Sequence, residues 1–522
     1  MGHHRTALRT TAVGAVSATL VAGGVLGLAP AAQAATSGIR FVGIRGADGT
    51  VLKANVVTPA GTDGTGRHPL IVFPTSWSFP QVEYLAQARR LADSGYIVLT
   101  YNVRGFWQSG GEIEVAGPPD VADASTVVDW ALAHTAADPR NIGIGGVSYG
   151  AGISLLAAAH DPRIKAVAAL SGWADLTRSI YSGRTEHVQA AALLDATGTV
   201  TGRHSAETRR AFDDFYSADL SKEQDLIAWG KKRSPGTYLD QLNDNGAAVM
   251  LANTWGDTIF PPNQYADFYE KLTGPKRLAF RPGDHATAEL TGLFGLPNDV
   301  WADTVRWFDH HLRGVDNGID REQPVRIKSR STSGYEGYPD WKSVTATARK
   351  VNLTGTTTIR ANVNSGADGG TVFLSSILDQ IARLPPVASI PLLPRRWAAV
   401  WQSQTYAGTQ QVRGTARLHT TVTPTQESGT LVAYLYDVGP LGLGKLVTNA
   451  PYTFHGRTPG EPFGVDLELF STAYDVPAGH RLALVVDTVD PLYIEHNPTG
   501  ARLTFSSPPN DPSYVSIPLR EQ

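Results

Sequence analysis

The chain contains no cysteine among its 522 residues. Disulfides, thiolate metal sites and cysteine nucleophiles are therefore excluded. The formal net charge of −3 gives no global field that would attract nucleic acid or an anionic membrane surface. Beyond the N-terminal region no segment has 18 consecutive apolar residues, so we expect no stable membrane insertion of the mature protein. A hydrophobic content of 42% and a charged content of 18% indicate an ordinary folded protein.

The N-terminal segment has the three parts of a secretory signal peptide. Arg5 and Arg9 form a basic head, an uncharged run of small and apolar residues extends from about 11 to 32, and Ala32-Gln33-Ala34 is an A-x-A cleavage site. We therefore expect residues 1–34 to be removed and the mature protein to be secreted. An uncut membrane anchor is the alternative, but the run is only weakly apolar.

Between residues 35 and about 330, short apolar runs rich in β-branched residues alternate with longer helical stretches. This alternation predicts an α/β domain whose mainly parallel sheet is covered by helices on both faces. The predicted strands cover residues 51–57, 70–73, 96–101, 142–147, 166–170, 248–252 and 277–280, and the predicted helices cover 82–92, 121–135, 150–160, 262–272 and 300–312.

Two regions depart from this alternation. Residues from about 173 to 245 are polar and helix-prone, which predicts a helical cap over the carboxyl edge of the sheet, although an insertion away from the site is the alternative. Residues 345–522 show short alternating strands separated by Pro and Gly turns, which predicts a C-terminal β-sandwich of jelly-roll type. Its predicted strands cover residues 416–422, 429–437, 465–469, 481–487 and 501–505.

The segment Gly146-Val147-Ser148-Tyr149-Gly150 has the pattern G-x-S-x-G. The pattern alone is common, but here a predicted strand enters it and a predicted helix leaves it. This context is typical of the nucleophile elbow of an α/β-hydrolase, with Ser148 as the nucleophile. The glycines allow a close approach around a strained serine, and the turn leaves the Tyr149 N–H free to bind an oxyanion.

A serine nucleophile needs a histidine base and a carboxylate that orients the histidine. In this fold the acid and then the histidine follow the serine along the chain. Asp257 follows the predicted strand 248–252 and His285 follows the predicted strand 277–280, so both have the required order and position. Asp284 is the alternative acid, but adjacent residues seldom reach the geometry of a triad.

Two further loops at strand ends carry candidate site residues. The second oxyanion donor should follow the predicted strand 70–73, where Thr75 and Ser76 can donate through a backbone N–H or a hydroxyl. The alternative is a plain turn in which Trp77 lines the pocket. Trp255, beside Asp257, is a second candidate pocket residue.

Arg104 lies in another strand-end loop and could contact substrate, but a buried structural pair with a carboxylate is the favoured role.

These segments resemble the serine hydrolase family of cocaine esterase and Xaa-Pro dipeptidyl-peptidase. The resemblance rests on the following stretches, in chain order: Val103-Arg104-Gly105 with Ser109-Gly110, the acidic run 120–123 before 127–130, the serine elbow, Trp255-Gly256-Asp257, Gly283-Asp284-His285, Asp437-Val438 and Pro477-Ala478-Gly479-His480. It implies an α/β-hydrolase core, a helical cap and a jelly-roll domain beside the active site. It also implies the triad Ser148, Asp257 and His285, and an oxyanion hole made by the Tyr149 amide and the residue after Pro74. That residue is commonly tyrosine in the family and is Thr75 here, so a shorter hydroxyl or a backbone amide must substitute.

The resemblance leaves the substrate open, because the family contains dipeptidases, ester hydrolases and amide acylases. A dipeptidase must anchor a free amino terminus, usually with carboxylates of the cap, and Glu186, Asp213 and Asp214 are available there. We predict a secreted serine hydrolase that cleaves a small ester, amide or peptide, including Xaa-Pro dipeptidyl bonds, with neither a metal nor an organic cofactor. The alternative is a catalytically inactive extracellular binding protein, against which the intact order of serine, aspartate and histidine argues.

Overall fold

The computed structural model describes residues 38–60, 66–345, 347–375, 378–379 and 385–521. The expected signal peptide lies outside the described residues. Among the described residues, none of the helices combines the length and the apolar composition that crossing a membrane requires.

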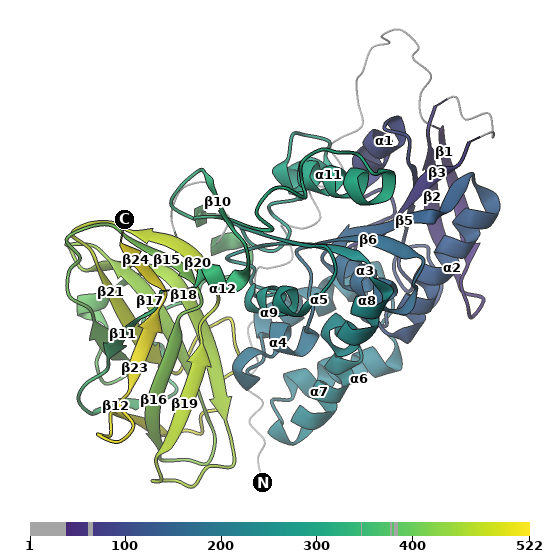
Figure 1. Cartoon of the computed structure of the whole chain (residues 1–522). Coiled ribbons are helices and arrows are strands. Elements are labelled where there is room, and N and C mark those ends of the chain that lie inside the picture. The colour runs from purple at the N-terminus through teal and green to yellow at the C-terminus, as the bar shows by residue number, and fades with distance from the viewer. Residues whose placement is uncertain (1–37, 61–65, 346, 376–377, 380–384, 522) are drawn as a thin grey trace, which may run out of the picture. The chain divides into compact units, whose positions relative to one another are not determined.

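A ten-stranded sheet forms the centre of the N-terminal region (Figure 1). Its strand order is β1-β2-β4-β3-β5-β6-β7-β8-β9-β10. Neighbouring strands are parallel from β4 through β3, β5, β6, β7 and β8 to β9. The pairs β1–β2, β2–β4 and β9–β10 at the two edges are antiparallel. The strands are β1 Gly38–Arg45, β2 Val51–Thr58, β3 His68–Pro74, β4 Ile97–Tyr101, β5 Ala137–Val147, β6 Ile164–Leu170, β7 Ala248–Thr254, β8 Lys276–Arg281, β9 Val325–Lys328 and β10 Tyr335–Tyr338.

Helices cover both faces of this sheet, as the alternating sequence predicts. Figure 1 shows α1 and α11 on one face and α2, α3 and α8 on the other. These helices and their neighbours are α1 Leu85–Asp93, α2 Pro118–His134, α3 Tyr149–His160, α8 Leu239–Asn245, α9 Asn263–Lys271, α10 Leu290–Leu293 and α11 Asp299–Arg313. Helix α11 shows how sequence sets such an element: the Asn298 side chain accepts the N–H groups of Val300 and Trp301, and Gly314 ends the helix in a left-handed conformation.

The sheet reaches further at both edges than the sequence pattern predicts. Strand β1 was not expected, because most of its side chains are exposed and its alternation is weak. Strands β9 and β10 add two short edge strands, so the sheet extends past residue 330 into the expected linker.

The segment between β6 and β7 contains the helical insertion (residues 173–245). It consists of α4 Leu176–Ile180, α5 Val188–Thr201, α6 Ala206–Tyr216, α7 Glu223–Lys231 and α8, with short 3-10 turns between them. Ser205 begins α6 by accepting the N–H of Thr208. No strand occurs among the described residues of this insertion, in agreement with the sequence pattern.

The C-terminal region is an antiparallel β-sandwich. One sheet has the order β11-β23-β16-β22-β12, with β19 also paired to β16, the second has the order β13-β18-β17-β21-β14, and a small third sheet has the order β20-β15-β24. Leu418, Val422 and Phe505 from the first sheet and Leu431 and Leu484 from the second share one apolar core. The strands are β11 Arg349–Asn352, β12 Thr357–Arg360, β13 Val387–Ser389, β14 Ala399–Gln402, β15 Gln410–Gly414, β16 Arg417–Pro424, β17 Gly429–Val438, β18 Leu443–Phe454, β19 Phe463–Glu468, β20 Thr472–Val476, β21 Arg481–Asp487, β22 Arg502–Ser506, β23 Tyr514–Ile517 and β24 Leu519–Glu521, and a short helix α12 Trp341–Val344 precedes them.

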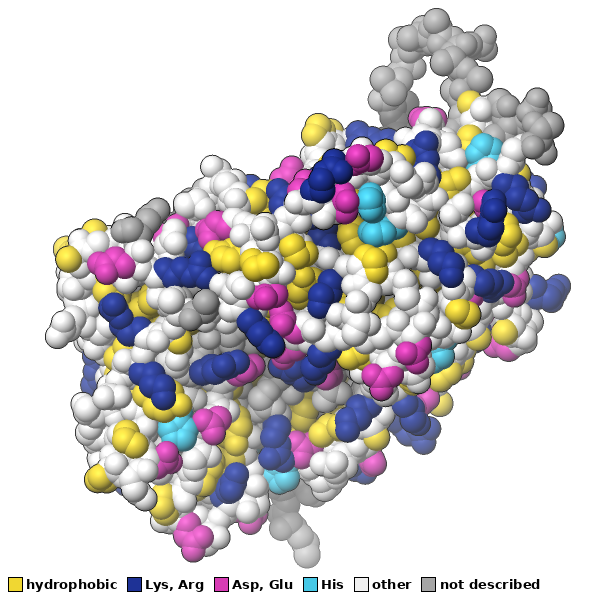
Figure 2. Space-filling model, viewed as in Figure 1, with side chains coloured by type: hydrophobic (Ala, Val, Ile, Leu, Met, Phe, Trp, Pro, Cys, Tyr) yellow, Lys and Arg dark blue, Asp and Glu magenta, His cyan; other side chains and the backbone are white. Residues whose placement is uncertain are grey.

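On the face shown in Figure 2, basic and acidic side chains alternate, and neither sign gathers into a large patch. This distribution agrees with the net charge of −3.

Candidate active site

Ser148 lies in the tight turn between β5 and α3, in a conformation with φ 57° and ψ −115°. A non-glycine residue rarely adopts a positive φ, and such strain concentrates at functional sites. The flanking glycines are required sterically. A Cβ on Gly150 would lie 2.3 Å from the carbonyl oxygen of Pro74, and one on Gly146 would lie 2.8 Å from the carbonyl carbon of Gly150. The two glycines therefore allow the backbone on either side of Ser148 to pack closely, which holds the serine in its strained turn.

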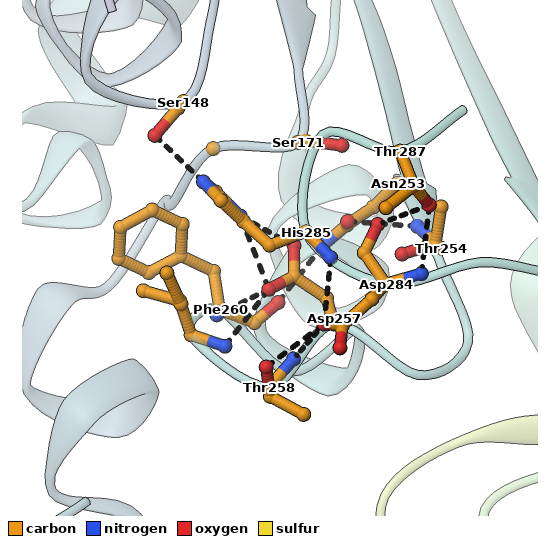
Figure 3. Close-up of polar contacts among 12 residues, drawn as sticks. Ser148, Ser171, Asn253, Thr254, Asp257, Thr258, Phe260, Asp284, His285 and Thr287 are labelled. Carbon is orange, nitrogen blue, oxygen red and sulfur yellow. Dashed lines mark hydrogen bonds and ion pairs between the residues drawn. The ribbon is translucent and has the colours of Figure 1, made fainter. Parts of the chain in front are cut away.

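The structure brings Ser148, His285 and Asp257 together (Figure 3). The Ser148 Oγ lies 2.7 Å from His285 Nε2. The His285 Nδ1 lies 3.0 Å from Asp257 Oδ2 and 3.2 Å from Asp257 Oδ1. All three side chains are buried, and each comes from a loop just beyond the carboxyl end of a strand: β5, β7 or β8. This is the arrangement in which a hydroxyl can pass its proton to an imidazole that a carboxylate orients.

The backbone of its own loop holds Asp257 in place. Its Oδ1 accepts the N–H groups of Ile259 at 3.0 Å and Phe260 at 2.7 Å. Burial lowers the pKa of His285, but the charge of Asp257 and its hydrogen bond outweigh burial and raise the pKa above its ordinary value of 6.5. The pair can therefore stabilise the imidazolium that a proton transfer would create.

Asp284, the alternative acid, does not contact the imidazole. Its Oδ1 accepts the backbone N–H of His285 at 2.7 Å, and it accepts the N–H and hydroxyl of Thr258, both at 2.8 Å. Burial and the neighbouring charge of Asp257 raise the pKa of Asp284 to about 6. The geometry thus separates the two aspartates: Asp257 faces the ring of His285 and Asp284 binds its backbone.

The candidate oxyanion donors have different surroundings. Tyr149 begins α3, where the first N–H groups of a helix have no partner within the helix. The Ser76 N–H donates to Glu83 at 2.8 Å, and the Ser76 hydroxyl donates to Glu83 at 2.5 Å. The Ser76 hydroxyl also lies 2.9 Å from the Val147 carbonyl oxygen, a second acceptor. Because both donors of Ser76 have partners within the protein, the structure argues against Ser76 as an oxyanion donor. Burial raises the pKa of Glu83 to about 8.

Thr75 keeps one free donor. Its backbone N–H donates to the carbonyl of Tyr101 at 3.1 Å, and its hydroxyl oxygen accepts the N–H of Val103 at 3.4 Å. The hydroxyl proton is not used in that contact.

An apolar pocket (the Ser148 pocket) opens beside the serine. Trp77 lines it and packs edge-on against Tyr149 with the ring centroids 5.2 Å apart. Trp255 does not line it, because its indole N–H donates to the Lys328 carbonyl and its ring packs against Phe280. Trp255 instead lines a separate cavity of about 510 Å³ together with Asp257 and Thr258. The described residues that line the pocket include no Asp, Glu, Lys or Arg: they are Trp77, Val115, Ser148, Tyr149, Trp173, Leu176, Thr177, Ile180, Tyr181, Ala191, Leu194, Ala211, Phe212, Phe215, Leu226, Trp229, Gly230 and Phe260.

Most walls of the Ser148 pocket come from α4, α5, α6 and α7 of the helical insertion. Sequence reasoning placed this insertion near the strand ends but did not identify Ile180, Phe212 or Phe215 as lining residues. Their spacing on short helices is the same as that of ordinary core residues, so no sequence signal separates the two roles.

The three carboxylates suggested as anchors for an amino terminus do not line the Ser148 pocket. Glu186 is buried and accepts a hydrogen bond from His496 Nε2 at 2.7 Å. Asp213 is exposed and Asp214 is half-buried on α6. Arg104 has the structural role that was favoured for it, since its guanidinium binds Asp123 through two hydrogen bonds of 2.8 and 2.9 Å.

Comparison with known proteins agrees with this architecture. Residues 48–287 match the X-Pro dipeptidyl-peptidase (S15) family, and residues 317–516 match the X-Pro dipeptidyl-peptidase C-terminal non-catalytic domain. A Streptomyces avermitilis protein, named by inference as an Xaa-Pro dipeptidyl-peptidase, is 23% identical in an alignment of 491 residues that covers 76% of this chain and 68% of that one.

Two solved structures share the fold over nearly the whole chain. An α-amino acid ester hydrolase matches with a TM-score of 0.68 and 16% identity, covering 97% of this chain and 100% of its own. A CocE/NonD family hydrolase of Staphylococcus aureus matches with a TM-score of 0.65 and 13% identity, covering 92% of this chain and 94% of its own.

The fold and these matches define the chain as an α/β-hydrolase with a C-terminal antiparallel β-sandwich, and as a serine hydrolase by class. More specifically, the chain belongs to the S15 family of X-Pro dipeptidyl-peptidases, because the two domain models of that family match residues 48–287 and 317–516.

Proposed function

We propose that the protein is a secreted carboxylesterase for short apolar acyl groups, with Ser148, His285 and Asp257 as its catalytic triad. The observation that carries this proposal is the 2.7 Å contact between Ser148 Oγ and His285 Nε2 at the mouth of a pocket with uncharged walls. Secretion is supported by the signal-peptide pattern of residues 1–34.

The reaction follows from these positions. Ser148 attacks the ester carbonyl while His285 Nε2 takes its proton, and Asp257 holds the imidazole and stabilises its positive charge. The Tyr149 N–H and the Thr75 hydroxyl donate to the oxyanion of the tetrahedral intermediate. His285 then returns the proton to the leaving alcohol, and a water molecule activated by His285 hydrolyses the acyl-enzyme.

The Ser148 pocket suits the acyl part of the substrate. The leaving group must lie near His285 Nε2 to receive a proton, and His285 is not among the residues that line the pocket. The cavity volume is about 70 Å³. A dry cavity of roughly 150 Å³ holds a benzene molecule, so this one fits a short alkyl chain better than an aromatic ring.

The same pocket disfavours a dipeptidyl substrate. A free amino terminus keeps its positive charge only if a carboxylate or several acceptors replace its water, and burying an unpaired ammonium costs several kcal/mol. The described residues that line the pocket include no carboxylate, and Glu186, which lies outside it, is bound to His496.

Paired chromogenic substrates test the proposal. We expect p-nitrophenyl butyrate to be cleaved with a kcat/KM about 100-fold or more above that of Ala-Pro p-nitroanilide, because the second requires a buried, unpaired ammonium. A preference for the dipeptidyl anilide would overturn the esterase assignment while leaving the triad intact.

Labelling with a fluorophosphonate tests the triad itself. The wild type should be labelled, and Ser148→Ala and His285→Ala should not. Ser154→Ala is the matched control, because Ser154 is a buried serine on the same helix whose hydroxyl donates to the Gly150 carbonyl. A folded wild type that fails to label would refute Ser148 as the nucleophile.

A further inference from the structure

Asp284 is fully buried beside the proposed base, between the loops of His285 and Thr258 (Figure 3). It accepts hydrogen bonds from these two loops and from a third segment. Its Oδ1 binds the backbone N–H of His285, on its own loop, and both the N–H and the hydroxyl of Thr258, on the loop of Asp257. Its Oδ2 accepts the backbone N–H of Phe373 at 2.9 Å. One carboxylate therefore joins the loop of the acid, the loop of the base and a third segment 89 residues away in the chain.

The third segment, residues 369–373, belongs to the part of the chain that matches the C-terminal non-catalytic domain. It is fastened at two other points. The Gly369 N–H donates to Asp490 Oδ2 in the sandwich region, and the Val372 N–H donates to Gln189 Oε1 on α5 of the helical insertion. The ring of Phe373 lies near His285, with the ring centroids 6.2 Å apart. The C-terminal region thus reaches the proposed base directly.

We propose that Asp284 is a positioning residue for the base, and that the segment 369–373 of the C-terminal region completes the cradle that holds it. The inference rests on the proposed function, since it assigns a role to a neighbour of His285. Asp284 does not touch the serine or the imidazole ring. It acts by fixing the His285 backbone relative to Thr258, the residue that follows Asp257.

The arrangement requires the ionised carboxylate. Four donors point at its two oxygens, and an ionised carboxyl accepts all four, whereas a protonated one must donate with one oxygen. Hydrogen bonds to a charged acceptor are about twice as strong as neutral ones, which makes the cradle stiff. A stiff backbone matters because small displacements of a reacting group reduce the rate strongly.

The charge of Asp284 also acts on the base. The charged groups that face His285 are Asp257, Asp284 and Glu289, and each of them raises the pKa of its imidazole against the effect of burial. Burial raises the pKa of Glu289, whereas the charge of Arg281 lowers it and so favours the ionised form. Removing the negative charge of Asp284 should therefore lower the pKa of His285.

Asp284→Asn is the first variant, measured as kcat, KM and the pH profile of kcat/KM with p-nitrophenyl butyrate. The asparagine side chain has the same shape as aspartate, but its NH₂ group must face N–H or O–H groups that donate to Asp284 in the wild type. We expect kcat to fall about 10-fold or more with little change in KM, because a residue that positions the base affects the geometry of the reaction and not substrate binding. We also expect the acid limb of kcat/KM to move about one pH unit lower, since His285 loses a neighbouring negative charge.

Thr258→Val is the second variant, and it keeps Asp284 in place while removing the hydroxyl that donates at 2.8 Å. The cradle then has three donors instead of four, while the negative charge of Asp284 stays in place. We expect kcat to fall about 3-fold with little change in KM and with the acid limb at the wild-type position. The two variants thus separate the effect of Asp284 on geometry from the effect of its charge on the base.

Asp123→Asn is the matched control. Asp123 is an equally buried carboxylate that binds Arg104 outside the site, so this variant should lose stability while its acid limb stays at the wild-type position. A kcat that stays at the wild-type value in Thr258→Val, or an acid limb that stays unmoved in a folded Asp284→Asn, would overturn the positioning role. If Asp284→Asn does not fold, Thr258→Val alone decides the question. An inactive wild type would instead refute the proposed function.

Discussion

The substitution Asp257→Asn should nearly abolish turnover, and the hydrogen bonds around Asp257 show why. The Oδ1 position receives the N–H groups of Ile259 and Phe260, so the carbonyl oxygen of the asparagine must occupy it. The NH₂ group then takes the place of Oδ2 and faces His285 Nδ1 at about the present 3.0 Å. Because NH₂ donates, Nδ1 must accept, and the imidazole proton moves to Nε2.

In that tautomer Nε2 points a hydrogen at Ser148 Oγ and cannot accept its proton. We expect kcat with p-nitrophenyl butyrate to fall about 10,000-fold, equivalent to about 5.4 kcal/mol of transition-state stabilisation. Asp309→Asn is the control. Asp309 lies on the distant helix α11 and accepts a hydrogen bond from the Tyr96 hydroxyl, so this variant should retain activity. If Asp257→Asn kept more than about a tenth of the wild-type kcat, the tautomer argument and the role of Asp257 would both be wrong.

Three further predictions concern the pocket and the pH profile. Phe212→Ala removes a ring that lines the Ser148 pocket, so two further methylenes of a longer acyl chain can become buried and kcat/KM for p-nitrophenyl octanoate should rise about 10-fold relative to the butyrate. An unchanged dependence of kcat/KM on chain length would exclude this pocket as the acyl site. Thr177 places a buried hydroxyl with no hydrogen-bond partner among the described residues in the same pocket, and Thr177→Val should lower KM for the butyrate about 2- to 5-fold; a higher KM would show that the hydroxyl serves the substrate. Activity requires neutral His285, whose pKa is raised above 6.5 by Asp257 against burial, so kcat/KM should fall as the pH drops through a value above 6.5; an acid limb below 6.5 would contradict this electrostatic balance.

The elements that carry the proposed nucleophile could be predicted because their signals are local. The run 142–147 is apolar and ends in the glycine-serine turn, and the helix that follows is rich in alanine and leucine. The structure gives β5 to Val147 and α3 from Tyr149, within the uncertainty of any helix boundary. The sequence does not predict β9, which has only four residues, or β18, which contains Gly444, Asn449 and Pro451.

The surroundings of the site could not be predicted, because they depend on contacts between distant segments. The sequence predicts Ser76 as a candidate donor, but its N–H and its hydroxyl both contact the carboxyl group of Glu83, seven residues further along the chain. Trp255 stands beside Asp257 in sequence, yet its indole points to the Lys328 carbonyl instead of the pocket. Phe373 gives no sign in sequence of any relation to Asp284.

The proposed triad therefore says less about the substrate than the helical insertion and the C-terminal region do. Ester and amide hydrolases use the same serine, histidine and aspartate, so the choice falls to the helical insertion, which supplies uncharged walls. Its one fully buried carboxylate candidate for binding an amino terminus, Glu186, is held by His496 of the sandwich region. A peptide substrate would have to break that hydrogen bond and leave a buried histidine without its partner, a cost of about 1–3 kcal/mol before any contact is gained. An alkyl ester requires neither change, which supports the proposed preference for ester substrates.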